Sequence, residues 1–268
     1  MSERGAQNMA SHVQGSGTEA GKEFAGLTAV ITGAASGIGL ATARLLHQQG
    51  ATIIGLDLNQ GELKEFATWI YCDVSTLESV TKAFAEVKQK TSVVDILINN
   101  AAVGSIGTVE SESEENWEKI FNINVFSVAR VTKAALPLLR KSKVPSIVNT
   151  CSIAATAGIP NRIIYSASKG AIRTMTFSMA CDFLKDRIRV NCVNPGTADT
   201  PWVQRLLSQA DDPVAERERL EARQPWGRLV SAEEVASSVA YLASPRQGST
   251  TATEISVDGG MQNLRVPN

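Results

Sequence analysis

Histidine, cysteine and long apolar runs are all scarce in this sequence. The 268 residues include 2 histidines and 4 cysteines, and the cysteines are scattered without a Cys-x-x-Cys pair: Cys72, Cys151, Cys181 and Cys192. We therefore predict reduced, mostly buried thiols, with neither a disulfide framework nor a metal site. No run of about 18 apolar residues occurs, so a membrane-spanning helix is excluded on length.

An excess of charge of one sign is also missing. The chain has 26 lysines and arginines against 27 aspartates and glutamates, for a net charge of −1. This balance argues against a surface that follows nucleic-acid phosphates and against a polybasic membrane patch. A small molecule is the expected partner. The length and the 43% of hydrophobic residues suit one large α/β domain.

The start of the chain differs in composition from the rest. Residues 1–24 are rich in Ser, Gly, Gln and Glu, and they contain no apolar run suitable for a signal peptide. We predict a disordered tail over 1–24, a single folded domain over 25–268, and a cytoplasmic location.

From Leu27 onward, short runs rich in Val and Ile alternate with longer segments that are apolar at helical spacing. The expected strands are Leu27–Thr32, Thr52–Leu56, Thr68–Cys72, Asp95–Asn99, Ser146–Cys151, Ile188–Val193 and Glu254–Val257. Strands separated by helices pair in parallel through right-handed crossovers. The pattern therefore predicts a doubly wound, seven-stranded parallel sheet with helices on both faces.

A glycine-rich stretch, Thr32–Gly39, follows the first expected strand and runs into a helical pattern. A glycine turn at a helix N-terminus presents free backbone N–H groups to a pyrophosphate, although a plain tight turn is the alternative. Asp57 ends the second strand, where a carboxylate can accept the ribose hydroxyls and repel a 2′-phosphate. The nearby loop positions carry no basic residue, so NAD is favoured over NADP. Asp57 could instead simply cap a turn.

Tyr165 and Lys169 stand four residues apart in a helix expected to begin near Ile163. An ammonium beside a phenol favours the phenolate, which can take a proton from an alcohol. Alone, this pair is also what a surface lysine over a half-buried tyrosine would give.

Four motifs in order make the chain resemble the short-chain dehydrogenase/reductase family, from about Phe24 to Met261. They are the glycine loop, Asn99-Asn100-Ala101-Ala102, Tyr165-x-x-x-Lys169 and Asn194-Pro195-Gly196. The resemblance implies a Rossmann-like fold and NAD-dependent oxidation of a secondary alcohol to a ketone. Ala102 departs from the glycine that is usual in the family at this position.

The resemblance also implies roles for individual residues. Asn124, Ser152, Tyr165 and Lys169 match the catalytic set, with Asn124 preferred over its neighbour Asn122. Further matches imply cofactor contacts from Gly33, Ser36, Gly37, Ile38, Gly39, Asp57, Asp73, Val74, Asn100, Pro195, Gly196, Thr197 and Thr200, in addition to Tyr165 and Lys169. For the loop residues among them, a turn-forming role is the alternative.

Substrate choice in this family depends on a lid, which matches residues 197–227 here. The chain resembles the branch with cytosolic-type 3-hydroxybutyrate dehydrogenase and dehydrogenases of 2-keto-3-deoxy sugar acids, in which arginines matching Arg162, Arg205 and Arg223 face a carboxylate. Two of these lie in a charged stretch that is equally typical of a solvated helix face. The indoles of Trp202 and Trp226 could stack on a sugar or pack the lid closed.

Two alternatives to a hydroxy-acid dehydrogenase stay open at this point. One is a dehydrogenase of neutral sugars or polyols, and the other is a non-catalytic NAD-sensing protein. We also expect a homotetramer, because small residues on the catalytic helix allow close helix packing and Glu254–Met261 resembles the subunit-contacting edge of the family. The small residues are Ala167, Ser168, Gly170 and Ala171.

Overall fold

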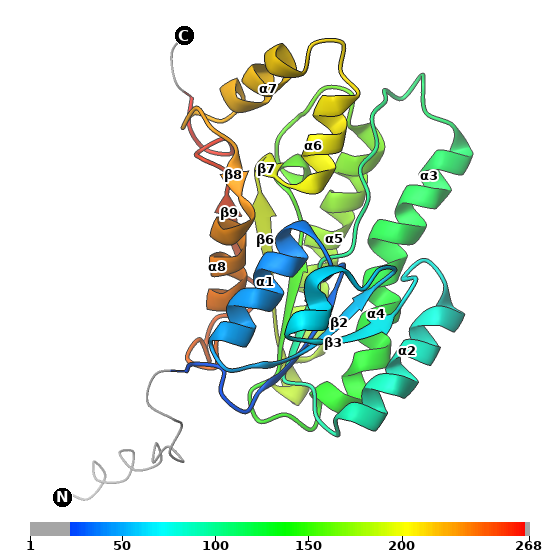
Figure 1. Ribbon diagram of the computed structural model, residues 1–268, viewed down its shortest axis with the longest axis vertical. Helices are drawn as coiled ribbons and strands as arrows, with labels where there is room; N and C mark the ends of the chain where they lie inside the picture. The colour runs from blue at the N-terminus through cyan, green and yellow to red at the C-terminus, as the bar shows by residue number, and fades with distance from the viewer. Residues whose placement is uncertain (1–21, 266–268) are drawn as a thin grey trace, which may run out of the picture.

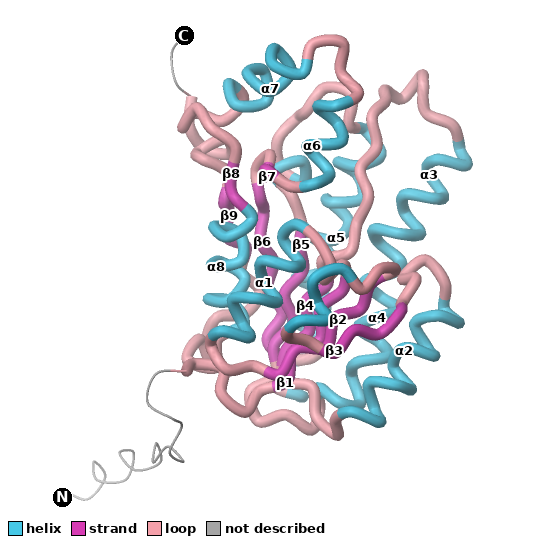
Figure 2. The backbone as a smooth tube through the Cα atoms, in the orientation of Figure 1, coloured by secondary structure: helices cyan, strands magenta, loops and turns pink. Residues whose placement is uncertain are grey.

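A computed structural model describes residues 22–265 and contains a seven-stranded parallel sheet between two layers of helices (Figure 1, Figure 2). The strand order is β3-β2-β1-β4-β5-β6-β9. The strands are β1 (Thr28–Thr32), β2 (Thr52–Asp57), β3 (Thr68–Tyr71), β4 (Ile96–Asn99), β5 (Ser146–Thr150), β6 (Arg189–Pro195) and β9 (Glu254–Val257). This confirms the predicted doubly wound sheet, and each strand falls on its predicted run.

Alternate residues of the strands build separate hydrophobic clusters on the two faces of the sheet. In β1, Val30 packs into the cluster under α2 (Leu77–Lys90), α4 (Ser127–Leu139) and α5 (Ile163–Asp182). Its neighbours Ala29 and Ile31 pack into the other cluster, under α1 (Gly37–Gln48) and α8 (Ala232–Ala243). Side chains of a strand alternate between its faces, so runs that are apolar throughout suit a sheet covered on both sides.

The strand order reverses direction at β1, whose neighbours are β2 and β4. In open parallel sheets, the crevice at such a point, beyond the carboxyl ends of the strands, is where ligands bind. The glycine loop after β1 and the Asn100 segment after β4 both lie at this edge of the sheet.

A π-helical turn (Asn122–Phe126) joins α3 (Glu114–Phe121) to α4. Such turns are rare in proteins, and those that occur are often found at functional sites. Three short 3₁₀ segments complete the described connections, at Gly61–Glu65, Ile153–Ala155 and Leu184–Asp186. The sequence analysis did not predict the π-helical turn.

The lid lies over the carboxyl-terminal edge of the sheet and contains α6 (Pro201–Ser208) and α7 (Pro213–Ala222), drawn in yellow and orange in Figure 1. A small parallel pair that was not predicted, β7 (Ala198–Asp199) with β8 (Val230–Ser231), brings its two ends together. Gln224 strengthens this closure, because its side-chain amide donates to the Thr197 and Arg228 carbonyl oxygens at 3.3 and 2.6 Å.

The predicted tail, residues 1–24, lies almost entirely outside the described residues. Its last residue is an exception, because Phe24 is fully buried in the cluster under α1 and α8. The packed domain therefore begins slightly before the predicted boundary. Across residues 22–265, no helix combines the length and apolarity required to cross a bilayer.

Candidate active site

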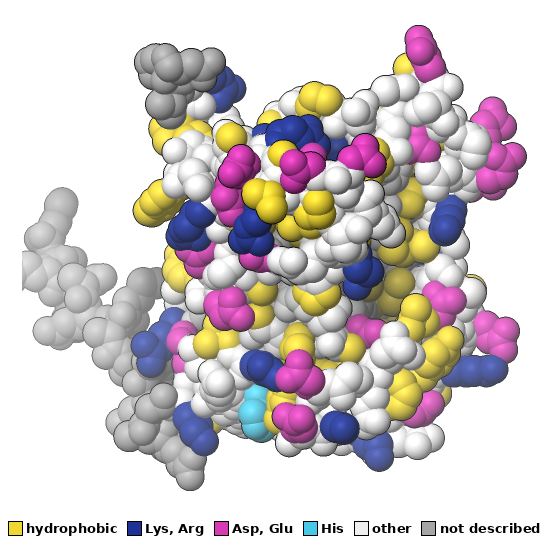
Figure 3. Space-filling model, turned by 45° about the horizontal axis from the view of Figure 1, so that its top comes forward, with side chains coloured by type: hydrophobic (Ala, Val, Ile, Leu, Met, Phe, Trp, Pro, Cys, Tyr) yellow, Lys and Arg dark blue, Asp and Glu magenta, His cyan; other side chains and the backbone are white. Residues whose placement is uncertain are grey.

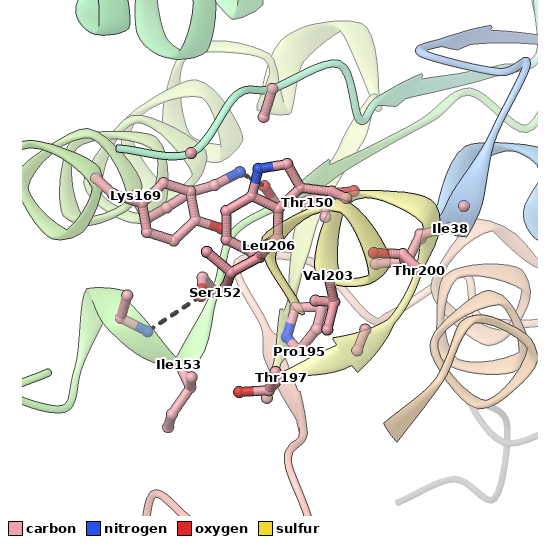
Figure 4. A pocket seen from close by; sticks show the side chains of 18 of the residues that line it. Ile38, Thr150, Ser152, Ile153, Lys169, Pro195, Thr197, Thr200, Val203 and Leu206 are labelled. Carbon is pink, nitrogen blue, oxygen red and sulfur yellow. Dashed lines mark hydrogen bonds between the residues drawn. The ribbon is translucent and has the colours of Figure 1, made fainter. Parts of the chain in front are cut away.

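A cavity of about 300 Å³ opens at the carboxyl ends of β1, β4, β5 and β6, beneath the lid. Its walls combine three predicted groups: the glycine-loop residues, the Ser152, Tyr165 and Lys169 set, and the three arginines. Figure 4 shows Ser152 and Lys169 in this cavity together with Val203 and Leu206 of the lid.

The predicted tyrosine and lysine lie on one face of α5, which begins at Ile163 as expected. The Lys169 ammonium is 5.6 Å from the centre of the Tyr165 ring and donates to the Thr150 carbonyl oxygen at 2.8 Å. Lys169 is only 2% exposed, so this buried charge depends on the few acceptors around it. The bond also ties α5 to the end of β5.

Ser152 follows β5 directly and is buried at the wall of the cavity. Its hydroxyl oxygen accepts a hydrogen bond from the Ala154 backbone N–H at 3.1 Å. The hydroxyl hydrogen remains available to an acceptor in the cavity. Ser152 and Tyr165 thus present two hydroxyl groups to one space, which is the arrangement that the sequence predicted.

The two neighbouring asparagines have different environments. Asn124 is fully buried in the π-helical turn, and its side chain pairs with the backbone N–H and carbonyl of Val103 at 2.8 and 2.9 Å and with the Ser168 hydroxyl at 3.1 Å. These bonds tie the turn to α5 and to the loop after β4. Asn122 points elsewhere, toward Ser75 and Arg130. The structure thus places Asn124, not Asn122, beside the catalytic helix.

The glycine loop has the geometry of a phosphate site. Gly37 has φ +53°, a backbone conformation that favours glycine. A side chain on Gly39 would overlap the Gly33 carbonyl oxygen. Ser36 precedes α1 without capping a backbone N–H of that helix, so its hydroxyl and the first N–H groups are free to bind an anion. These residues fit the pyrophosphate of a dinucleotide.

Asp57 lies at the end of β2, and its carboxylate touches the glycine loop. The oxygens accept hydrogen bonds from the Ala35 and Asn59 backbone N–H groups at 3.0 and 3.1 Å. Asp57 therefore does cap a turn, and its charge also stands beside the loop. The structure shows the turn-capping role, and the contact with a cofactor ribose stays a prediction that the position of the carboxylate suits.

The other residues predicted to contact the cofactor surround the same edge of the sheet. Asn100 donates to the Thr32 and Gly33 carbonyl oxygens at 3.1 and 3.2 Å, which holds the glycine loop against β4. The Asp73 and Val74 pair follows β3 away from the cavity wall. The cavity wall includes Ser36, Gly37, Ile38, Asn100, Pro195, Gly196, Thr197 and Thr200.

All three predicted arginines line this cavity: Arg162, Arg205 and Arg223. None of them forms an ion pair within residues 22–265, although α7 is rich in glutamate. Burial lowers the pKa of Arg162, and the charge of Arg223 lowers it further. Burial also lowers the pKa of Arg223, with Arg219 adding to the effect. The Glu216 carboxylate, which pairs with Arg219, acts in the opposite direction on the pKa of both arginines. Partly buried like charges that have no ion-pair partner of their own in the described chain suit an anion site.

The other lid arginines have the solvated role that the charge pattern also allowed. Arg217 pairs with Asp199 and Glu221 at 3.0 and 2.9 Å, and Arg219 pairs with Glu216 at 2.6 Å. Figure 3 shows acidic and basic side chains interspersed over this end of the molecule.

The two indoles of the predicted lid also differ in environment. Trp202 lines the cavity, whereas Trp226 is 74% exposed and stacks with Arg228.

The sequence analysis missed several apolar residues of the cavity wall. They come from distant segments and are Val103, Gly104, Ile153, Ile159, Leu206 and Leu220. No local pattern distinguishes them from core residues, because only the packing of the lid over the sheet brings them together.

Comparisons with known proteins agree with this geometry. The family described as "Enoyl-(Acyl carrier protein) reductase" matches residues 33–262. The "Dehydrogenase/reductase SDR family member 6" of Rattus norvegicus is 38% identical over 240 residues, which cover 88% of this chain and 97% of that protein. The "Cis-4-hydroxycyclohexanecarboxylate dehydrogenase" of Sinomonas cyclohexanicum is 36% identical over 250 residues, covering 90% and 98%.

Among solved structures, the ligand-free aldohexose dehydrogenase of Thermoplasma acidophilum matches with a TM-score of 0.85 at 32% identity. The match covers 92% of this chain and 99% of the other. The similarity thus extends over the sheet, the cavity and the lid together.

Proposed function

This chain belongs to the short-chain dehydrogenase/reductase family of oxidoreductases, and we propose that it oxidises a secondary alcohol of a small or sugar-derived hydroxy acid to a ketone, reversibly and with NAD. The family binds a nicotinamide cofactor and acts on small molecules. The observation that carries the proposal is one cavity lined by Ser152, Tyr165, Lys169, the glycine loop and three arginines that form no ion pair within residues 22–265.

The proposed reaction begins with the proton of the substrate hydroxyl. The Tyr165 oxygen takes this proton, and the nearby Lys169 ammonium stabilises the phenolate electrostatically. The Ser152 hydroxyl donates to the substrate oxygen and stabilises its charge as the carbonyl forms. Asn124 holds the π-helical turn against α5 and so positions this set.

A bound nicotinamide would accept the hydride from the carbon that carries the hydroxyl. In the proposal, the glycine loop binds the pyrophosphate of the cofactor, Asp57 binds the adenosine ribose and Lys169 binds the nicotinamide ribose. Asp73 and Val74 are proposed for the adenine, Asn100 for the adenosine ribose, and Pro195, Gly196, Thr197 and Thr200 for the nicotinamide end. The free hydroxyl of Ser36 supports the first assignment.

The three cavity arginines support an acid as substrate, because a carboxylate would supply the ion-pair partner that none of them has within residues 22–265. The name of the Sinomonas relative points the same way, since its substrate is a hydroxy acid. The Thermoplasma structure supports the neutral-sugar alternative, since an aldohexose carries no charge. A non-catalytic NAD sensor is the third candidate, and the complete Ser152, Tyr165 and Lys169 set argues against it. The cytoplasmic location stays a prediction.

We propose a homotetramer as the assembly. Gly170 on α5 has open space above it, and Phe126 beside the same layer is 52% exposed. β9 ends the sheet, so one of its edges has no strand partner in the described chain. Ser168 does not belong to the expected small-residue face, because it points inward to Asn124.

Replacing Tyr165 with phenylalanine tests the base. Tyr165→Phe should lower kcat by at least about a hundredfold, because general-base catalysis typically contributes 10²- to 10⁴-fold. The affinity for NADH, measured by fluorescence titration, should change little. Tyr71→Phe, at an exposed tyrosine, is the matched control. A Tyr165→Phe enzyme that keeps more than about one hundredth of the rate would contradict the role.

Asp57 tests the cofactor. The wild type should prefer NAD, and Asp57→Ala should raise the ratio of kcat/KM for NADP over NAD by about tenfold, because a like charge beside the 2′-phosphate is removed. Asp57→Asn separates this charge from the hydrogen bonds to Ala35 and Asn59 and should shift the ratio in the same direction. A wild type that prefers NADP would overturn the assignment.

Arg162 tests the acid substrate with two matched pairs of alcohols: cis-4-hydroxycyclohexanecarboxylate with cyclohexanol, and 3-hydroxybutyrate with 2-butanol. Arg162→Met should raise KM for the acid about tenfold or more, since a charge-assisted hydrogen bond contributes about 1.5–3 kcal/mol. The neutral alcohol should be affected much less.

Arg217→Met is the control, because Arg217 is paired with Asp199 and Glu221 outside the cavity wall. An equal rise in KM for the acid and the neutral alcohol would mean that Arg162 supports the structure of the site and does not bind the substrate carboxylate. A wild type active only on neutral sugars would remove the acid substrate from the proposal.

The mass of the particle in solution tests the assembly. Light scattering at micromolar concentration should give about four times the chain mass of 28.6 kDa. A monomer mass under these conditions would refute the tetramer.

A further inference from the structure

One glycine outside the predicted motifs is held against the lid by an unusually close contact. A Cβ placed on Gly104 would lie 2.8 Å from Cε2 of Trp202 and closer still to Cζ2. Real Cβ atoms do not approach other heavy atoms this closely, so a side chain at this position would force the indole to shift. The backbone does not require glycine here, because the φ of Gly104 lies outside the left-handed region.

The partner of Gly104 lies in the first turn of the lid helix α6. The lid helices have a small core of their own, in which Val203 and Leu207 of α6 pack with Leu220 and Leu229. This cluster is separate from the two clusters that cover the sheet. The contact between Trp202 and Gly104 is therefore one of those that attach α6 to the rest of the domain, beside the β7–β8 pair that precedes it.

Two cavity residues follow Trp202 on the same helix. Arg205 and Leu206 are three and four positions further on, so they share the side of α6 on which Trp202 lies. Both line the cavity, and so does Trp202 itself. A shift of α6 that follows the indole would also move the Arg205 guanidinium and the Leu206 side chain, which line the cavity.

We propose that Gly104 is a positioning residue. Because it has no side chain, the Trp202 indole packs directly against its backbone, and we call this contact the seat of Trp202. The seat fixes α6 so that Trp202, Arg205 and Leu206 form the lid side of the substrate cavity. The expected effect of Gly104 on KM rests on the proposed dehydrogenase function. The contact between Gly104 and Trp202 can be tested without any enzyme activity. Trp202 thereby limits the size of the substrate, and Gly104 limits how far Trp202 can withdraw from it.

The test combines Gly104→Ala with Trp202→Phe, because a phenyl ring lacks the far edge of the indole that meets Gly104. Gly248→Ala is the matched control, since a Cβ there would meet open space. The first readout needs no substrate: trypsin cleavage in the lid, after Arg205, Arg217, Arg219 or Arg223, followed by mass spectrometry with and without NADH. Gly104→Ala should speed this cleavage by about tenfold over wild type, and adding Trp202→Phe should restore most of the protection.

The second readout is steady-state kinetics with whichever alcohol of the two matched pairs is turned over. Gly104→Ala should raise KM about tenfold with a smaller change in kcat, and the double variant should recover most of the loss. If Gly104→Ala does not fold, Trp202→Phe alone should still speed lid cleavage relative to Gly248→Ala.

Cleavage and KM that match the Gly248→Ala control would overturn the proposal, and so would a loss that Trp202→Phe does not relieve. A wild type without hydride transfer would instead refute the dehydrogenase function, and the protease readout would still decide whether the seat exists.

Discussion

The site depends on a buried ammonium. Lys169 is almost without solvent, and its contact with the Thr150 carbonyl joins the catalytic helix to the end of β5. An ammonium has three donors, so a cation held this deeply also orders the acceptors around it. Tyr165 stands one helical turn away, and Ser152 follows Thr150 by two residues. One polar contact thus ties α5, which carries Tyr165, to the end of β5, which Ser152 follows.

A second constraint is the balance of charge in the lid. Arg217 and Arg219 have carboxylate partners, whereas the three arginines of the cavity wall have none in the described chain. Arg162 and Arg223 are half-buried, whereas Arg205 is exposed. Holding two half-buried guanidinium groups close together costs free energy, which the nearby Glu216 carboxylate offsets only in part. The close contact between Trp202 and Gly104 adds a steric constraint on the same segment.

Much of the fold could be predicted because its signals are local. In strand runs such as Thr52–Leu56, the four residues after Thr52 are apolar or glycine and all buried, as a sheet covered on both faces requires. The π-helical turn was not predicted, because it is stabilised by Asn124 bonding to Val103 and Ser168, both distant in sequence. The family resemblance already preferred Asn124 over Asn122, and these bonds show where the Asn124 side chain lies.

The sequence by itself determined the sheet, the glycine loop with Asp57, and the spacing of Tyr165 and Lys169. These features follow from the periods of strand and helix and from the backbone freedom of glycine. The tertiary structure alone decided which lid arginines pair with carboxylates and that Gly104 meets Trp202. The physical reason is that a contact between segments about a hundred residues apart depends on how the lid packs over the sheet, and no local period encodes that packing.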